Sequence, residues 1–169
     1  MSESTKQHRC ESPKSVRCAV VTISDTRTLE TDRGGELIMN LLIGGGHAVS
    51  SRHIVRDDPR EIEPMLRKLA DPNETDSVLL TGGTGIAARD RTFETVSGLL
   101  TKAMPGYGEI FRMLSYEDIG PAAMLSRAVG GVMNNVIVLT MPGSVAAVQL
   151  AMEKLIVPEI GHLVYEARK

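Results

Sequence analysis

The chain has 169 residues, a net charge of −2 at pH 7 and a sequence pI near 6.1. This balance excludes the strongly basic surface that binds nucleic acid or anionic membranes. With no tryptophan, three tyrosines and two phenylalanines, the sequence also has too few aromatic residues for a platform that stacks single-stranded bases. No apolar run reaches the ~18 residues of a membrane span. We therefore expect a soluble, cytoplasmic protein.

The polar residues 1–15 predict a disordered tail rather than a signal peptide, because they contain no hydrophobic stretch. Residues 16–169 are expected to form a single domain, since no linker divides them. Cys10 and Cys18 do not make a disulfide framework, and the four histidines show no metal-ligand spacing.

Strands and helices are expected to alternate in the first half of the chain. Apolar runs predict strands at residues 16–23 and 77–81, and alternation of apolar and polar residues predicts another at 47–55. Asp32 is the expected cap of the first helix, which ends at the glycines 44–46. Asp58, Pro59 and Glu61 have the pattern that begins a second helix after the second strand.

The second half continues with helices expected at 92–100 and 107–116, the latter with Ile110, Met113 and Leu114 facing inward. Residues 123–141 predict a hairpin that turns at Asn134-Asn135. An amphipathic helix, interrupted at Pro158, closes the chain. This order predicts an α/β sandwich around a mainly parallel sheet with a late β-hairpin.

Polar or glycine-rich clusters directly follow the predicted strands. They are Ser24-Asp25-Thr26, Asp57-Asp58, the stretch from Thr81 to Asp90, and Met141-Pro142-Gly143-Ser144. In open α/β sheets, the loops after the carboxyl ends of parallel strands line one crevice in which ligands bind. The sequence therefore predicts that these clusters converge in space.

The stretch TGGTGIAARD at residues 81–90 indicates a phosphate site. Its glycines leave backbone N–H groups exposed, and such groups bind anions. No lysine follows the glycines as it does in a P-loop, so a metal is expected to offset the phosphate charge. Asp57, Asp58 and Asp90 are suitable ligands for Mg²⁺. The combination favours phosphoryl or nucleotidyl transfer from a Mg-nucleotide.

Several of these residues, though not Asp57, also have a purely structural interpretation. Asp58 fits a helix cap, Asp90 fits a cap of the helix near Thr92, and residues 24–26 fit a strand-exit turn. The spacing Gly83-x-Gly85-x-x-Ala88 also matches the dinucleotide-binding fingerprint. That fingerprint normally opens the first βα unit, whereas this stretch follows the third strand, so the match is weak.

Several longer stretches occur in order from Val16 to the C-terminus. They are TISDTR, the Asp-x-x-Gly motif of Asp32 to Gly35, VRDD, TGGTGIAARDRT, PGYGEIFR, AAMLSRAVGG and MPGS. Together they resemble the MoaB/MogA family of molybdenum-cofactor biosynthesis proteins, and the short length and N-terminal tail resemble its MoaB branch. TGGTG, the RD after it and GYGE are highly specific in combination.

The resemblance implies a three-layer α/β/α sandwich that assembles into homo-trimers or hexamers. It implies a molybdopterin adenylyltransferase that uses Mg²⁺ and ATP: the terminal phosphate of the pterin attacks the α-phosphate, and pyrophosphate leaves. The small-molecule partners are thus molybdopterin and ATP. The molybdate-inserting enzyme of the same pathway is a candidate protein partner.

The resemblance also assigns roles to residues. Asp57 and Asp90 match the catalytic acids of the family and are expected to hold Mg²⁺. The phosphate cradle is expected at Thr81, Gly82, Gly83, Thr84 and Gly85. The residues expected to border or close the pterin and nucleotide pocket are Ser24, Asp25, Thr26, Glu109, Pro142, Gly143 and Ser144.

Two positions depart from the family pattern: Val145 replaces a usual proline, and Gly34 replaces a frequent hydroxyl residue. Two alternatives to the enzyme stay open at this point. One is a catalytically weak or inactive oligomer that binds pterin or nucleotide. The more distant one is a dinucleotide-binding oxidoreductase.

Overall fold

The computed structural model describes residues 11–169 and contains one six-stranded sheet with the order β2-β1-β3-β6-β5-β4. The strands are β1 (Arg17–Ile23), β2 (Ala48–Val55), β3 (Ser77–Thr81), β4 (Lys102–Ala103), β5 (Gly130–Met133) and β6 (Val136–Met141). β2, β1, β3 and β6 are parallel, whereas β5 is antiparallel to both β6 and β4. The predicted mainly parallel sheet is confirmed.

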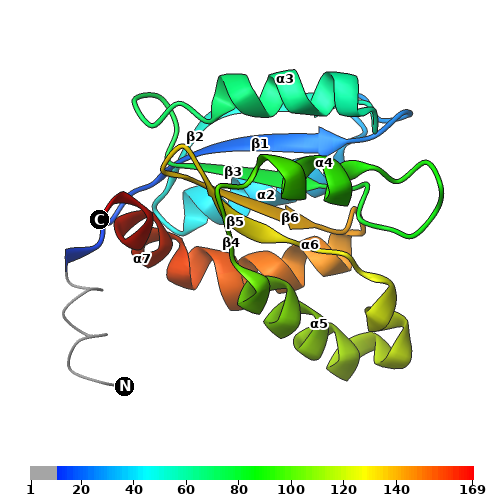
Figure 1. The fold of residues 1–169 in the computed structure, drawn as a ribbon. Helices are drawn as coiled ribbons and strands as arrows, with labels where there is room; N and C mark the ends of the chain where they lie inside the picture. Colours follow the sequence, from blue (N-terminus) through cyan, green and yellow to red (C-terminus); the bar gives the residue numbers. More distant parts are fainter. Residues whose placement is uncertain (1–10) are drawn as a thin grey trace.

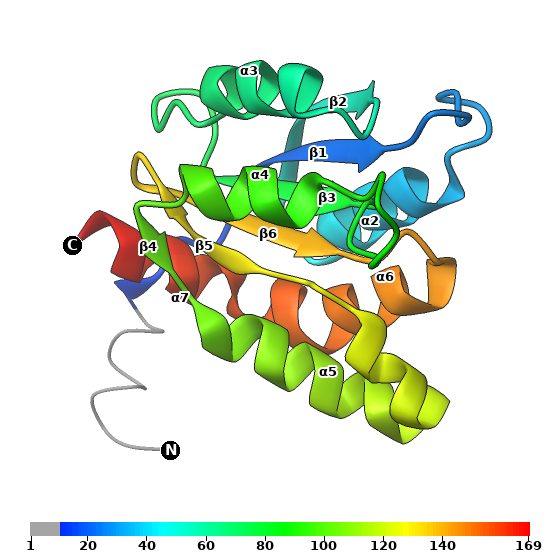
Figure 2. The ribbon, with the colours of Figure 1, turned by 45° about the vertical axis from the view of Figure 1, so that its right-hand side comes forward.

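Helices cover both faces of this sheet (Figures 1 and 2). α3 (Pro59–Leu69) and α4 (Thr92–Leu99) lie on one face. The other face carries α2 (Arg33–Gly44), α5 (Pro105–Ile119), α6 (Val145–Ala151) and α7 (Val157–Arg168). The 3-10 helix η1 (Gly120–Leu125) follows α5, and the π-helical turn η2 (Met152–Ile156) joins α6 to α7. The fold is therefore the three-layer α/β/α sandwich.

The strands build two cores because their side chains alternate between the faces. In β1, Cys18 and Val20 pack with α2 and α6, while Ala19 and Val21 pack with α3. A strand buried on both faces needs apolar residues at every position, which explains the continuous apolar runs in the sequence.

The predicted caps are confirmed. The Asp32 carboxylate accepts a hydrogen bond from the Gly35 N–H at 3.0 Å and caps α2. Asp58 caps α3 by accepting from the Arg60 N–H at 2.9 Å. The hairpin turns at Asn134 and Asn135, which have φ values of 51° and 63°.

The inward face of α5 differs from the predicted one. Ile110 and Met113 are 46% and 58% exposed, and Leu114 is half-buried. The buried residues of the helix are Tyr107, Gly108, Phe111 and Ser115. α5 has apolar residues on more than one face, so helical periodicity alone does not decide which face packs against β5 and α6.

Two other elements also differ. The predicted first arm of the hairpin began at residue 123, but 120–125 form η1, and β5 begins only at Gly130. The C-terminal helix is not broken at Pro158. The π-helical turn before α7 lets the chain pass the proline, which lacks an N–H donor, without leaving the helix.

The predicted tail lies mostly outside the described residues, but its last part contacts α7. The hydroxyl of Tyr165 donates to the Glu11 carboxylate, and the carbonyl of Pro13 would lie 2.7 Å from a Cβ added to Gly161. In residues 11–169, no helix combines the length and the apolar character that crossing a membrane requires.

Candidate active site

The loops at the carboxyl ends of β1, β2, β3 and β6 converge on two adjoining cavities that share Gly83. The first, which we call the acidic cavity, has about 150 Å³ and is lined by Ile23, Ser24, Asp25, Thr26, Asp57, Gly83, Arg89 and Asp90. The second, the apolar cavity, has about 300 Å³ and includes the chain from Pro142 to Ser144 in its lining. The predicted convergence of the four clusters is thus confirmed.

Asp57 lines the acidic cavity and is held by the start of α4. One carboxylate oxygen accepts from the Arg91 N–H at 3.2 Å and from the Thr92 hydroxyl at 3.0 Å. Burial raises the pKa of Asp57, these two hydrogen bonds oppose the rise, and repulsion from Asp90 and Asp25 adds to it. Asp57, Asp90 and Asp25 therefore line one cavity, and the repulsion that Asp57 feels from the other two favours a bound cation.

Asp90 does not cap α4 as the structural alternative proposed. The residue before that helix, Arg91, provides no side-chain cap, and the Asp57 carboxylate meets its N–H instead. The Asp90 carboxylate accepts from the Ala87 N–H at 2.9 Å and lines the acidic cavity beside Asp57. It is therefore held within its own loop and faces the cavity.

The glycines of the loop are required by the two aspartates. A Cβ on Gly83, whose φ is +65°, would lie 2.0 Å from the Thr92 Oγ1 and 2.7 Å from the Asp57 carboxylate. A Cβ on Gly85 would lie 2.5 Å from the Asp90 carboxylate. The bare backbone thus lets both acids approach the loop. In the described part of the chain, the N–H groups of Gly83, Thr84 and Gly85 have no protein acceptor, so they can serve a phosphate.

Thr81 and Gly82 connect the loops rather than bind phosphate, which corrects the prediction for both. The Gly82 N–H already donates to the Met141 carbonyl at 3.0 Å. The Thr81 hydroxyl donates to the Pro142 carbonyl at 3.1 Å, and neither residue lines a cavity. They fix the end of β3 against the end of β6.

Ser24 shapes the turn after β1, as the structural alternative proposed. Its hydroxyl accepts from the N–H groups of Thr26 and Arg27 at 3.3 and 3.1 Å. The turn nevertheless places Ser24, Asp25 and Thr26 on the wall of the acidic cavity. The structural and the site interpretations therefore both hold for this segment.

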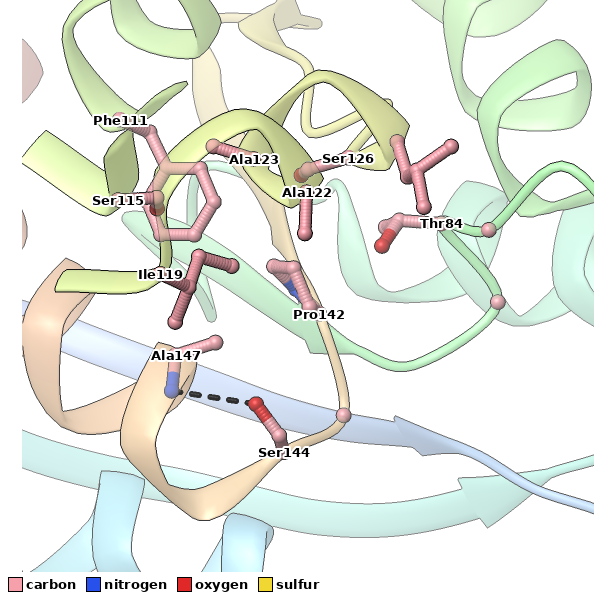
Figure 3. A pocket seen from close by; sticks show the side chains of 14 residues that line it. Thr84, Phe111, Ser115, Ile119, Ala122, Ala123, Ser126, Pro142, Ser144 and Ala147 are labelled. Atoms are coloured by element: carbon pink, nitrogen blue, oxygen red, sulfur yellow. Dashed lines mark hydrogen bonds between the residues drawn. The ribbon is translucent and has the colours of Figure 1, made fainter. Parts of the chain in front are cut away.

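The apolar cavity lies between the Gly83 loop, α5, η1 and the start of α6 (Figure 3). Phe111, Ile119 and Ala123 face it from α5 and η1, and Pro142 closes the opposite side. The Ser144 hydroxyl accepts from the Ala147 N–H at 3.3 Å and caps α6. The cavity can hold a flat, largely apolar group next to the glycine loop.

Glu109 lies away from both cavities, contrary to the prediction. It is exposed on α5 and lines a separate cavity of about 280 Å³ together with Arg112 and Met104. The motif PGYGE places Tyr107 in the core, and its acid points to another side of the helix.

Two arginines that no sequence pattern indicated also bear on the site. Arg89 lines the acidic cavity and supplies a positive charge that no lysine provides. Arg127 contacts the loop from Thr84 to Asp90. Both lie in stretches that carry the family resemblance, but a solvated surface arginine would have the same sequence signature.

The donor set fits Mg²⁺ only together with phosphate oxygens. Across residues 11–169, no group of three or more His, Cys, Asp or Glu side chains could hold a metal. Asp57 and Asp90 line one cavity, and one or two carboxylates with phosphate and water are what Mg²⁺ usually takes. The dinucleotide interpretation fits less well, because α4 begins only at Thr92 and the glycines do not open the helix.

Comparison with known proteins agrees with this fold. Residues 19–162 match the family described as "Probable molybdopterin binding domain". The fold and this match define the class as a molybdopterin-binding-type α/β domain. The chain is 52% identical over 167 residues to "Molybdenum cofactor biosynthesis protein B" of Halalkalibacterium halodurans, covering 98% of each chain.

Solved structures extend the likeness. A crystal structure of "Molybdenum cofactor biosynthesis protein B" has a TM-score of 0.89 and 54% identity, covering 92% of this chain and 98% of the other. The "tungsten cofactor synthesizing protein MoaB" of Pyrococcus furiosus has a TM-score of 0.81 and 35% identity, covering 93% and 99%. The chain belongs to the MoaB/MogA family of molybdenum cofactor biosynthesis proteins, in its MoaB branch.

Proposed function

We propose that the protein adenylylates molybdopterin with Mg-ATP and releases pyrophosphate. The observation that carries the proposal is the junction of the two cavities at Gly83. There, the acidic cavity with Asp57 and Asp90 meets the glycine loop, whose N–H groups have no acceptor among the described residues, and the apolar cavity lies directly beside it. A metal-bound polyphosphate and a flat ring system need these two environments side by side.

Asp57 and Asp90 are the residues that would hold Mg²⁺ on the ATP phosphates. When bound, Mg²⁺ supplies charge neutralisation at the phosphate oxygens. The side chain of Arg89 adds a positive charge on the same wall. The two aspartates contribute by position, because the closely packed glycine loop fixes where their oxygens lie.

In the proposed reaction, an oxygen of the pterin's terminal phosphate forms a bond to the α-phosphorus of ATP. The bond from that phosphorus to the oxygen bridging to the β-phosphate breaks, and pyrophosphate takes the electron pair. The attacking phosphate is already an anion at neutral pH, so the site needs no strong general base. The N–H groups of Gly83, Thr84 and Gly85 would donate to the phosphates, which is supported by their position on the cavity wall.

The test is adenylyl transfer with a matched pair of variants. The purified protein is incubated with molybdopterin, ATP and Mg²⁺, and adenylylated pterin and pyrophosphate are measured. Asp90→Asn should abolish turnover without unfolding the protein. Asp58→Asn is the control, since Asp58 lies outside the acidic cavity and asparagine also caps helices well.

The outcomes distinguish an adenylyltransferase from a non-catalytic protein that binds pterin or nucleotide. Equal turnover in Asp90→Asn and wild type would contradict the assignment of the metal site. Binding of Mg-ATP by wild type without pyrophosphate release would instead indicate a non-catalytic member that binds pterin or nucleotide.

We also propose that the chain forms a homo-oligomer, a trimer or hexamer. The support is the outer surface of α5, where Ile110, Met113, Tyr116 and Ile119 are between 46% and 60% exposed. Apolar side chains gathered on one helix are typical of protein interfaces. Sedimentation equilibrium measures the state, and a monomer at micromolar concentration would contradict it.

A further inference from the structure

Arg127 lies in the segment between η1 and β5, outside both cavities, and contacts the loop that carries Asp90. We propose that Arg127 is a positioning residue that holds Asp90 and the glycine loop in the geometry needed to bind Mg-ATP. Only the expected change in the KM for Mg-ATP rests on the proposed function, because amide exchange measures the holding of the loop separately.

Arg127 donates to three carbonyl oxygens of this one loop. Its Nε donates to the Gly85 carbonyl at 2.7 Å, and its Nη2 donates to the Asp90 carbonyl at 2.8 Å. Its backbone N–H donates to the Thr84 carbonyl at 3.0 Å. The fork of the guanidinium therefore joins the two ends of the stretch between Gly85 and Asp90, which a single ammonium cannot do in the same way.

The guanidinium itself is fixed by α4. Its Nη1 donates to the Glu94 carboxylate, and its carbon lies 5.3 Å from the centroid of the Phe93 ring. A guanidinium stacked on a ring and paired with an acid loses little further freedom when it binds the loop. Arg127 thus clamps the loop between α4 and the segment before β5.

The loop has few other supports in the described chain. Residues 82–91 contain no helix or strand, and Ile86 is 67% exposed. The Asp90 carboxylate is oriented by the Ala87 N–H, and the Asp90 N–H donates back to the Ala87 carbonyl, both at 2.9 Å. This small turn closes only while the chain on either side of it stays in place, and Arg127 binds the carbonyls of Asp90 at its end and of Gly85 two residues before its start.

The test uses Arg127→Lys, which keeps the charge and loses the fork. Amide hydrogen exchange at Ala87 and Asp90 reports the turn directly. We expect exchange at both amides to rise about tenfold in the variant, as the loss of about one hydrogen bond's free energy would produce. The KM for Mg-ATP should rise several-fold while the KM for molybdopterin stays unchanged.

Two further variants give the comparison. Arg112→Lys is the matched control, because Arg112 donates to the Ser126 and Ala128 carbonyls at 3.4 Å and not to the loop. Glu94→Gln removes the charge that pairs with Arg127 and leaves the carbonyl bonds, so its exchange should lie between those of wild type and Arg127→Lys.

The proposal is overturned if Arg127→Lys has the same amide exchange at Ala87 and Asp90 and the same KM for Mg-ATP as the wild-type protein. If the wild-type protein shows no adenylyl transfer, the proposed function fails. Faster exchange confined to Arg127→Lys and Glu94→Gln would then still support the holding of the Asp90 loop.

Discussion

Two aspartates near the same sheet edge, the buried Asp32 and the half-buried Asp57, have opposite surroundings. Asp32 is 1% exposed and accepts from the Thr22 hydroxyl at 2.7 Å, the Gly35 N–H at 3.0 Å and the Arg52 guanidinium at 2.9 Å. Burial works against its ionised form, but the bonds from Gly35 and Arg52 outweigh burial and lower the pKa of Asp32.

Among the described residues, the donors to Asp57 are both neutral: the Arg91 N–H and the Thr92 hydroxyl. Burial raises its pKa, and the negative charges of Asp90 and Asp25 raise it further. The fold thus compensates the charge of Asp32 by itself, whereas it leaves the charge of Asp57 for a ligand to compensate. Asp32 contributes to stability, whereas Asp57 is held ready at some cost to stability, as functional groups often are.

The largest expected effect is on stability, at Asp32. Asp32→Ala leaves Arg52, whose side chain is 16% exposed, without its carboxylate and removes the cap of α2. Breaking a buried pair by removing one partner costs about 3–5 kcal/mol of the free energy of unfolding. Urea denaturation measures the loss, and a loss below about 1 kcal/mol would show that Asp32 is not structural.

Asp57→Asn should separate activity from stability. Turnover should fall roughly 10²–10³-fold, because metal-linked charge stabilisation contributes several kcal/mol. The free energy of unfolding at pH 7 should stay equal or rise, since asparagine can accept the same bonds from Arg91 and Thr92 without the charge. A clear loss of stability would mean that Asp57 resembles Asp32 after all.

The pH dependence of stability should differ between the two kinds of acid. The lowered pKa of Asp32 means that its stabilisation is present above the unfolded value of about 3.9 and is lost as the pH falls through the folded value. Asp57 has a raised pKa, so its ionisation costs stability as the pH rises from about 3.9 through the folded value.

Urea titrations at several pH values test this sign. The stability advantage of Asp57→Asn over wild type should be absent below about pH 4 and present at neutral pH. If the stability advantage of Asp57→Asn were largest at acidic pH, the pKa shifts of Asp32 and Asp57 would not have opposite signs.

The smallest effect is expected at Asp58. Asp58→Asn should change the free energy of unfolding by no more than about 0.5 kcal/mol and leave turnover at the wild-type level. Asp58 is a partly exposed cap paired with an exposed arginine, Arg60, and asparagine caps equally well. Loss of turnover in this variant would move the metal site from Asp57 toward Asp58.

Sequence reasoning found β1, β3, α2 and α3 almost residue for residue, because their signals are local. A buried strand needs a continuous apolar run, and Asp32 and Asp58 are caps readable within a few residues. The predicted inward face of α5 was wrong for the opposite reason. Its burial depends on which neighbours pack against it, and Ile110 and Met113 look as suitable for a core as Phe111 does.

The sequence by itself determined the parallel strands, the starts of α2 and α3 and the meeting of four loops at one edge, because parallel strands bring their carboxyl ends together. Only the tertiary structure decided which residues of those loops line the cavities and which bind other segments. In the folded chain, the Gly82 N–H donates to the Met141 carbonyl, Glu109 lines a separate cavity, and Arg127 donates to the Asp90 carbonyl. These contacts join segments distant in the chain, and no local pattern of residues encodes them.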